Sequence, residues 1–373
     1  MIVRRIRRQA QRMLQRDKVM AAALALAVLS SLINLPRLEY INFQVLSLLF
    51  CLMLVVTGFK KLRVLDYLAV ALLQKCATYQ AAGFALLALT FVSSMLVTND
   101  VALLTFVPLT LTVARALNIN AAKLVIWQTL AANLGSALTP MGNPQNLFLY
   151  AHYGIEPSAF VQIMLPLALF SAVWLVALLL SQSNYELRLK LPEVQVERGL
   201  KLYCFAFLFL LNILTVLRLV DYKLALLLTC VVVWKLSPRL FRYVDYSLLL
   251  TFIGFFIFIG NIANWQPVLW LKNSFLGSDL GVYVTAILVS QIISNVPAAM
   301  LLAGFTDAAE PLLLGVNVGG LGTLVASMAS VISFKLYVAN VKGENNYYLR
   351  QFTCYNVAGL AAIGVLVWLI YKI

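Results

Sequence analysis

Long apolar runs separated by short polar segments make up most of the chain. A helix needs about 17 to 25 apolar residues to cross a bilayer. Runs of this kind lie near residues 19–35, 42–59, 122–150, 158–182, 202–220, 223–236, 246–263, 310–338 and 352–371. The run at 223–236 is short, and Pro238 marks its end. The pattern predicts an all-α polytopic membrane protein with about nine transmembrane helices.

Two further apolar segments, 79–113 and 281–304, are each interrupted midway by a polar string. The strings lie 196 residues apart and are Thr98-Asn99-Asp100 and Ser294-Asn295-Val296. Unpaired polar groups at membrane depth are costly, so such strings persist where they line a cavity and bind something. The pattern predicts two re-entrant hairpins, each of which enters and leaves the membrane on the same side.

A second pair of polar strings interrupts two of the runs, 122–150 and 310–338. The strings lie 184 residues apart and are Asn133-Leu134-Gly135 and Asn317-Val318-Gly319. In the first run, Pro140 follows a few residues later, and the helix cannot continue there without cost. Asn143 followed by Pro144 then signals the start of a new helix. We therefore expect a broken helix in each of the two runs.

Paired breaks in two halves of a chain are typical of secondary transporters. The first unit, 19–182, is expected to cross the membrane twice, form its hairpin and cross twice more. The cytoplasmic linker and extra crossing within 183–222 then reverse the second unit, 223–373. The number of crossings therefore predicts two inverted repeats, which follow a basic cytoplasmic N-terminus, residues 1–18. We expect the two hairpin tips to meet near the membrane midplane.

Composition and charge support the membrane assignment. Hydrophobic residues make up 62% of the chain and charged residues 11%, and mean hydropathy is +0.92. With the N-terminus in the cytoplasm, most of the 28 Lys and Arg residues fall on cytoplasmic segments. The net charge of +14 is therefore a topology signal, and the C-terminus is expected outside. We expect the basic N-terminus to lie on anionic lipid headgroups, and a nucleic-acid partner is not favoured.

The breaks place half-helix ends and free backbone groups at one depth. Carbonyl ends suit a cation, and the positive N-terminal ends suit an anion. A single Asn, Ser or Gly in a membrane helix is usually explained by close packing, but four clusters at related places favour binding. The predicted substrate- or ion-binding residues are Thr98, Asn99, Asp100, Asn133, Thr139, Gly142, Asn143, Ser294, Asn295, Asn317, Gly319, Thr323 and Ser327.

Asp100 is the one acid of the fourteen that this topology places inside the membrane. A buried carboxylate is costly unless it is protonated, paired or bound to a cation. Asp100 is therefore a candidate proton carrier or cation ligand. The alternative is a helix cap that accepts backbone N–H groups of the outgoing hairpin arm, and both roles can hold together.

Four stretches together resemble the ion transporter superfamily, which includes arsenite permeases, divalent-anion/sodium symporters, citrate–metal transporters and sodium/proton antiporters. The stretches are SMLVTNDVALLTFVPLTL, ANLGSALTPMGNPQNLFLY, SQIISNVPAAMLL and GVNVGGLGTLVASMASVISF. The resemblance covers about residues 19–371 and is closest to bacterial arsenite-permease-like anion permeases. It implies an elevator-type transporter, usually a homodimer, in a bacterial plasma (inner) membrane, whose hairpins and broken helices carry substrate past a scaffold.

In the sodium-coupled symporters of this superfamily, the hairpin tips and broken helices form two sodium sites. By position, the resemblance implies sodium sites at Thr98, Asn99, Gly142 and Asn143 and at Ser294, Asn295 and Ser327. The chain departs from the symporter pattern, because the third tip residue is Asp100 in one half and Val296 in the other. The second broken helix also lacks the proline and glycine of the first. These departures favour coupling to protons or to a single cation.

None of the four clusters contains Lys or Arg. An anionic substrate would have to be held by backbone N–H groups, helix dipoles and Asn, Ser or Thr side chains. This suits a small anion, a bound cation–anion pair or a neutral oxyacid such as arsenite, whereas free citrate fits less well. We expect a secondary active transporter of a small anion or oxyacid, with H⁺ or Na⁺ as coupling ion and no other cofactor.

Two other functions compete with this one. An intramembrane enzyme would need two buried carboxylates, or a metal cluster of His, Glu or Cys. With one buried acid, one histidine and five scattered cysteines, the sequence argues against an enzyme. A sodium/proton antiporter of the same fold stays open, because Asp100 could exchange the two cations.

Overall fold

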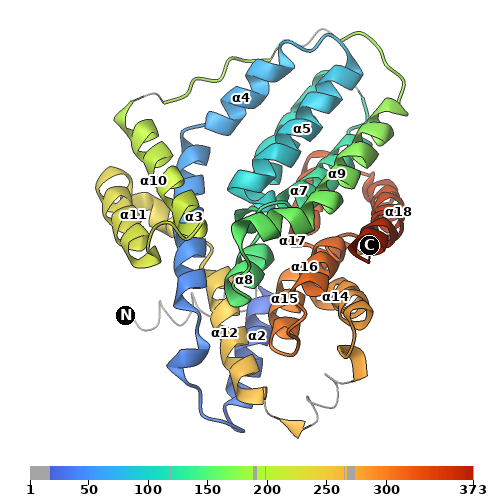
Figure 1. The fold of residues 1–373 in the computed structure, drawn as a ribbon. Helices are drawn as coiled ribbons and strands as arrows, with labels where there is room; N and C mark the ends of the chain where they lie inside the picture. Colours follow the sequence, from blue (N-terminus) through green and yellow to red (C-terminus); the bar gives the residue numbers. More distant parts are fainter. Residues whose placement is uncertain are drawn as a thin grey trace.

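The computed structural model describes residues 17–117, 119–187, 191–197, 199–263, 265–266 and 274–372. Every regular element in these residues is a helix, as the sequence predicts (Figure 1). The basic segment 1–16 and the C-terminal Ile373, for which the sequence predicts a cytoplasmic and an external position, lie outside the described residues.

The helices of the first half largely follow the predicted apolar runs. They are α2 (Lys18–Ser30), α3 (Phe43–Lys61), α4 (Val64–Leu73), α5 (Tyr79–Val97), α6 (Asn99–Ala116), α7 (Ala122–Ser136), α8 (Pro144–His152) and α9 (Pro157–Leu180), with the 3-10 turns η1 (Leu38–Tyr40) and η2 (Pro140–Gly142). The side chains of Asp17, Asn42 and Thr78 accept hydrogen bonds from first-turn N–H groups, which explains where α2, α3 and α5 begin.

The second half is built in the same way. Its elements are α10 (Leu200–Val216), α11 (Tyr222–Leu236), η3 (Pro238–Tyr243), α12 (Tyr246–Ile262), α14 (Asp279–Ile293), α15 (Asn295–Ala303), α16 (Ala309–Val318), η4 (Leu324–Ala326), α17 (Met328–Asn340) and α18 (Asn345–Tyr371). Asp221, Asp245 and Ser278 cap the starts of α11, α12 and α14. The short helix α11 ends just before Pro238, as predicted.

Four helices of the described chain, α3, α5, α9 and α18, are long and apolar enough to cross a membrane by themselves. Other apolar helices, among them α2, α10, α12, α14 and α16, are shorter. Helix α5 is the incoming arm of the first predicted hairpin, and its 19 residues already have crossing length. Length alone does not separate a re-entrant arm from a crossing one, so the re-entrant hairpins and the number of crossings stay predictions.

Helix α7 lies in the interior of the helix bundle. It contacts α5, α6, α9, α17 and α18, and all of its residues except Lys123 are buried. A helix that is buried on all sides belongs to the core. Figure 1 shows α10 and α11 packed on α3 at one side of the molecule, α2 beside α12, and α14, α15 and α16 grouped at another side.

The predicted interruptions of 79–113 and 281–304 are confirmed, and both have the same backbone geometry. Thr98, between α5 and α6, has φ 74° and ψ 150°. Ser294, between α14 and α15, has φ 76° and ψ 153°. A positive φ outside glycine costs of order 1–3 kcal/mol and occurs in turns and at functional sites. We call residues 98–100 the first tip and residues 294–296 the second tip.

The helices are also interrupted within both runs for which the sequence predicts a broken helix. In the first, α7 ends at Ser136 and α8 begins at Pro144. In the second, α16 ends at Val318 and α17 begins at Met328. We call residues 137–143 the first break and residues 319–327 the second break.

Candidate functional site

Asn133 on α7 is the centre of a buried polar cluster. Its Oδ1 accepts hydrogen bonds from Asn99 Nδ2 at 3.3 Å and from Ser327 Oγ at 2.9 Å. Its Nδ2 donates to Ser330 Oγ at 3.5 Å. All four residues are buried, and we call them the Asn133 cluster. The cluster joins the first tip, the interior helix α7 and the start of α17.

The grouping differs in part from the one that the resemblance implies. Asn99 and Ser327 belong by position to different sodium sites, yet both donate to the same oxygen of Asn133. Asn143, of the first implied site, donates through Nδ2 to Ser136 Oγ at 2.8 Å. In the second implied site, Ser294 Oγ donates to the backbone carbonyl just before Ser327, at 3.3 Å. The structure therefore links the two predicted groups through Asn133.

The contact between Asn133 and Ser330 recurs at the matched positions of the second half. Asn317 on α16 lies 184 residues after Asn133, and its Nδ2 donates to Asn146 Oδ1 on α8 at 2.7 Å. Ser330 in turn lies 184 residues after Asn146. In each broken helix, the asparagine of the first part thus donates to a residue in the second part of the other broken helix, and the two acceptor residues occupy matched positions.

Thr139 and Thr323 also make matched contacts. Thr139 Oγ1 donates to the carbonyl of Met95 on α5, and Thr323 Oγ1 donates to the carbonyl of Gln291 on α14 at 3.1 Å. Met95 and Gln291 lie 196 residues apart, as the two tips do. The Thr323 side chain is exposed. These threonines therefore fasten each break to the incoming arm of a hairpin and stand outside the Asn133 cluster.

Close packing of the broken helices requires glycine at matched positions. A Cβ on Gly135 would lie 2.8 Å from Ser94 Oγ, and a Cβ on Gly319 would lie 2.8 Å from Ser290 Oγ. The tightest place is Gly142 in the first break, where a Cβ would lie 2.1 Å from the backbone oxygen of Ser136. A backbone atom cannot swing aside as a flexible side chain can.

Gly142→Ala is therefore expected to lower the free energy of unfolding by about 1–3 kcal/mol, the usual cost of overpacking. The matched control is Gly364→Ala in α18, where the nearest atom to a new Cβ is Val318 Cγ1 at 3.3 Å. Thermal unfolding of the two purified variants in one detergent measures the difference. Equal melting temperatures would contradict the tight approach at Gly142.

An amide side chain already satisfies backbone carbonyls at each break. Asn146 Nδ2 lies at 3.0 to 3.4 Å from three carbonyl oxygens around the first break. Gln291 Nε2 donates to the carbonyls of Gly319 and Leu321 in the second break, both at 2.9 Å. The sequence predicts free carbonyls here that suit a cation. The structure shows instead that several of them carry a hydrogen bond from within the protein.

The N-cap side chains at the tips and breaks do not cap their own helices, although Asn99 Oδ1 accepts from the Asp100 N–H in the first turn of α6. The N-cap residues of α6, α8, α15 and α17 make no side-chain hydrogen bond to their own helix; they are Thr98, Asn143, Ser294 and Ser327. Polar N-cap side chains cap α2, α3, α5, α11, α12 and α14. The N-cap residues of α4, α7, α9, α10, α16 and α18 also make no such bond, so the four starts are distinguished by their place at the tips and breaks. Uncapped first-turn N–H groups at the positive end of a helix bind anions. The four starts therefore favour an anionic group in the substrate.

Buried polar atoms without a partner gather in the same region. Seven buried side-chain nitrogen or oxygen atoms have no hydrogen-bond partner in the described part of the chain, and four of these lie at or beside the tips and breaks. The four are Asp100 Oδ1, Asn143 Oδ1, Gln145 Nε2 and Asn317 Oδ1. Buried polar atoms are nearly always satisfied by protein, water or ligand. Three of the four are oxygens, and hard cations bind through oxygen ligands.

The helix-cap interpretation of Asp100 finds no support in these contacts. Thr98, not Asp100, is the N-cap residue of α6, and Asp100 Oδ1 has no partner among the described residues. The backbone N–H of Asp100 donates to Asn99 Oδ1 at 2.9 Å. The carboxylate therefore stays available for a proton or a cation.

The structure adds Gln145, Asn146, Gln291 and Ser330 to the site, which the sequence reasoning missed. Gln145 and Asn146 directly follow Pro144, and Gln291 lies three residues before the second tip. Amide side chains inside an apolar stretch were the available signal. Ser330 carried no such signal, because single serines are common in membrane helices.

Comparison with known proteins matches residues 2–332 to the family described as "Citrate transporter". The uncharacterized transporter MJ0456 of Methanocaldococcus jannaschii is 33% identical over 324 residues, which cover 85% of this chain and 88% of that protein. The inner membrane protein YbiR of Escherichia coli is 34% identical over 309 residues, which cover 79% and 80% of the two chains.

The solved structure of the Alcanivorax borkumensis YdaH transporter has a similar fold. It superimposes with a TM-score of 0.54 at 13% identity and covers 88% of this chain and 86% of that one. At this identity the likeness concerns the fold alone, which is that of a membrane transporter. The match to the family extends over most of the chain, and the chain belongs to the citrate transporter family of integral membrane proteins.

Proposed function

We propose that the protein is a secondary active transporter of a small anion or oxyacid, coupled to protons or sodium. The observation that carries this proposal is the set of four uncapped helix starts at the tips and breaks. Two of these starts, those of α6 and α17, hold Asn99 and Ser327 of the Asn133 cluster. Anionic substrate groups are commonly held by half-helix N-termini in transporters with broken helices.

The side chains at the site limit the class of substrate. The tips, the breaks and the Asn133 cluster contain no Lys or Arg. A tricarboxylate such as citrate, which the family description names, would therefore need a bound cation to offset its charge in a low-dielectric site. A small anion, or an anion already paired with a cation, fits the arrangement better.

Asp100 is the proposed coupling group. Its Oδ1 and the Oδ1 atoms of Asn143 and Asn317 are buried without partners in the described chain. A proton on Asp100, or a single Na⁺ on oxygens of this kind, would remove the cost of the buried carboxylate.

The matched geometry of the two halves supports the proposed mechanism. Thr98 and Ser294 share a rare backbone conformation, and Asn133 and Asn317 make matched contacts. We propose two inverted repeats whose hairpins and broken helices move past a scaffold by an elevator-type mechanism. We also propose a homodimer in the plasma (inner) membrane, with the N-terminus in the cytoplasm and the C-terminus outside.

Sodium/proton exchange is the alternative, because Asp100 and neighbouring oxygens could serve two cations without an anion. Thermal stability of the purified full chain separates the two functions. We expect small oxyanions, tested with and without Na⁺, to raise the melting temperature, and the same anions to be taken up by proteoliposomes. Stabilisation by Na⁺ alone, together with sodium-driven proton movement and no anion uptake, would establish the antiporter instead.

A further inference from the structure

A cavity of ≈ 290 Å³ lies at the far end of α6 from the first tip. Arg115 is sixteen residues after Asn99, which places it about 24 Å further along the helix. Besides the end of α6, the cavity is bounded by the loop before α7, by the end of α17 and by the loop before α18. The polar residues of its lining are Arg115, Asn120, Tyr337, Asn340, Lys342 and Glu344.

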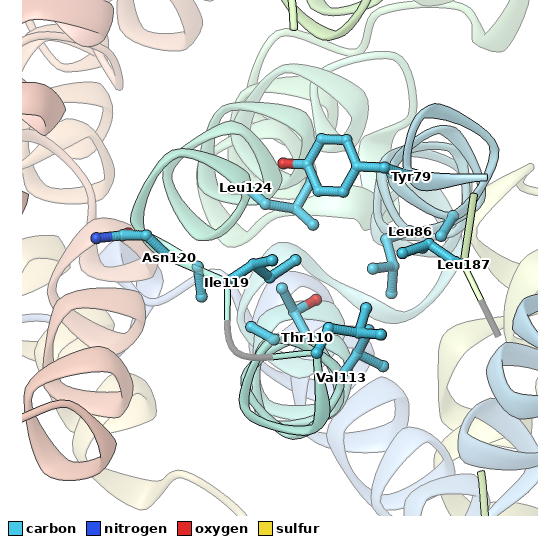
Figure 2. Close-up of a pocket in the computed structure, with 13 residues that line it drawn as sticks. Tyr79, Leu86, Thr110, Val113, Ile119, Asn120, Leu124 and Leu187 are labelled. Carbon is cyan, nitrogen blue, oxygen red and sulfur yellow. The ribbon is translucent and has the colours of Figure 1, made fainter. Parts of the chain in front are cut away.

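A second, much smaller cavity lies on the other side of the loop before α7. Its volume is ≈ 10 Å³, which is room for about one water molecule. Figure 2 shows its wall formed by Tyr79, Leu86, Thr110 and Leu124, while the amide of Asn120 points away from it. A ligand at this end of the molecule would therefore occupy the larger cavity.

Positive side chains of the larger cavity are not paired with acids. The ion pair within the described residues joins Lys201 and Glu197, at another place in the chain. Arg115 Nη2 instead donates to Asn340 Oδ1 at 3.2 Å, and Asn340 Nδ2 donates to the Leu336 carbonyl at 2.9 Å. This chain of bonds orients the guanidinium and leaves most of its five N–H donors for a ligand.

The one acid of the lining is held by neutral donors. Glu344 Oε2 accepts from Tyr337 Oη at 2.6 Å and from Asn120 Nδ2 at 2.9 Å. The formal charge of the lining is thus +2 from Arg115 and Lys342 and −1 from Glu344. The ends of α6 and α17 and the starts of α7 and α18 all meet here, so the helix dipoles offset one another and the side chains decide the sign.

We propose that this cavity is an anion-binding site, separate from the Asn133 cluster, which takes one phosphate or carboxylate group between Arg115 and Lys342. Guanidinium and ammonium groups are the usual partners of such anions. A bound anion would bridge the end of α6 and the loop after α17. Asn99, the first residue of α6, and Ser327, the N-cap residue of α17, both donate a hydrogen bond to Asn133. Occupancy of the cavity would thereby hold together the two helices that frame the transport site.

Inorganic phosphate tests the site in the purified full chain, in a neutral detergent. We expect phosphate to raise the melting temperature of the wild type, and Arg115→Gln and Lys342→Gln to raise its apparent dissociation constant about tenfold. Lys235→Gln is the matched control, because Lys235 is an exposed lysine of α11 outside the cavity. Asn99→Ala should keep the phosphate response even where it loses anion uptake, which separates this proposal from the proposed function.

A second arm distinguishes the source of the anion. The same variants are compared in nanodiscs of phosphatidylglycerol and of phosphatidylcholine. A response to phosphate assigns the site to a soluble anion, and a response to phosphatidylglycerol alone assigns it to a lipid headgroup; either supports the proposal if Arg115→Gln and Lys342→Gln weaken it.

Asn340→Asp provides a further variant if Arg115→Gln does not fold, because it places a carboxylate on the Arg115 guanidinium and should weaken anion binding similarly. The proposal is overturned if neither phosphate nor phosphatidylglycerol stabilises the wild type. It is also overturned if the wild type and all cavity variants respond equally.

Discussion

Asn99→Ala and Asn295→Ala are expected to reduce uptake to background while the protein still folds and inserts. Asn99 Nδ2 donates to Asn133 Oδ1, and Asn295 is the matched residue of the second tip, buried beside Gly320. A hydrogen-bonding group removed from a buried polar site costs about 1–3 kcal/mol, or roughly 5- to 150-fold in affinity. Uptake of labelled anion by proteoliposomes measures the loss.

Asn356→Ala is the matched control for these two variants. Asn356 is also a buried asparagine, and its Nδ2 donates to the Phe352 carbonyl within α18; it belongs to neither a tip, a break nor the Asn133 cluster. We expect near-wild-type uptake from this variant. If Asn99→Ala and Asn295→Ala transport as well as the control does, the tip asparagines serve helix packing and not substrate binding.

Asp100→Asn is expected to uncouple transport while substrate binding stays measurable. The substitution keeps the size and most of the hydrogen bonding of the side chain but removes its charge and its titration. If Asp100 carries the coupling proton, uptake by the variant no longer responds to a pH gradient. If Asp100 is a Na⁺ ligand, sodium-dependent stabilisation weakens about tenfold or more, because a charged oxygen ligand becomes neutral.

The control for this variant is Asp221→Asn, which changes an aspartate that caps α11 through the Lys223 N–H. We expect this control to lose some stability and to keep its pH and sodium dependence. Unchanged pH and sodium dependence in Asp100→Asn would remove Asp100 from the coupling mechanism. The coupling ion would then have to be sought at Ser294, Asn295 and Ser327.

The breaks in the helices could be predicted from the sequence because their causes are local. Proline removes a backbone donor, and at the two tips the polar string marks the point where one helix ends and the next begins. The strings that begin at Asn133 and Asn317 lie within or at the end of α7 and α16, and the breaks follow them. Thr98 and Ser294 accordingly separate helices at the predicted places. Helix ends were predicted less well: the first run extends to residue 35, whereas α2 ends at Ser30. Apolar composition continues through a turn, so it does not mark where the backbone leaves the helix.

The absence of capping at the tips could not be predicted from residue type. Thr and Ser usually cap helices, but a capping residue needs an extended backbone to turn its oxygen toward the first-turn N–H groups. Thr98 and Ser294 have positive φ angles instead of that extended conformation. Asn143 and Ser327 are extended, but their side chains bond to Ser136 and Asn133 instead.

The sequence by itself determined the helical membrane class, the four interruptions and the residues that flank them, because hydropathy and helix breaking act over a few neighbouring positions. Only the tertiary structure decided which polar groups meet. Asn133 joins Asn99 and Ser327 because α6, α7 and α17 pack against one another, and such long-range partners depend on how whole helices pack. The same packing brings the ends of α6 and α17 together around the cavity beside Arg115, which no local pattern in the chain predicts.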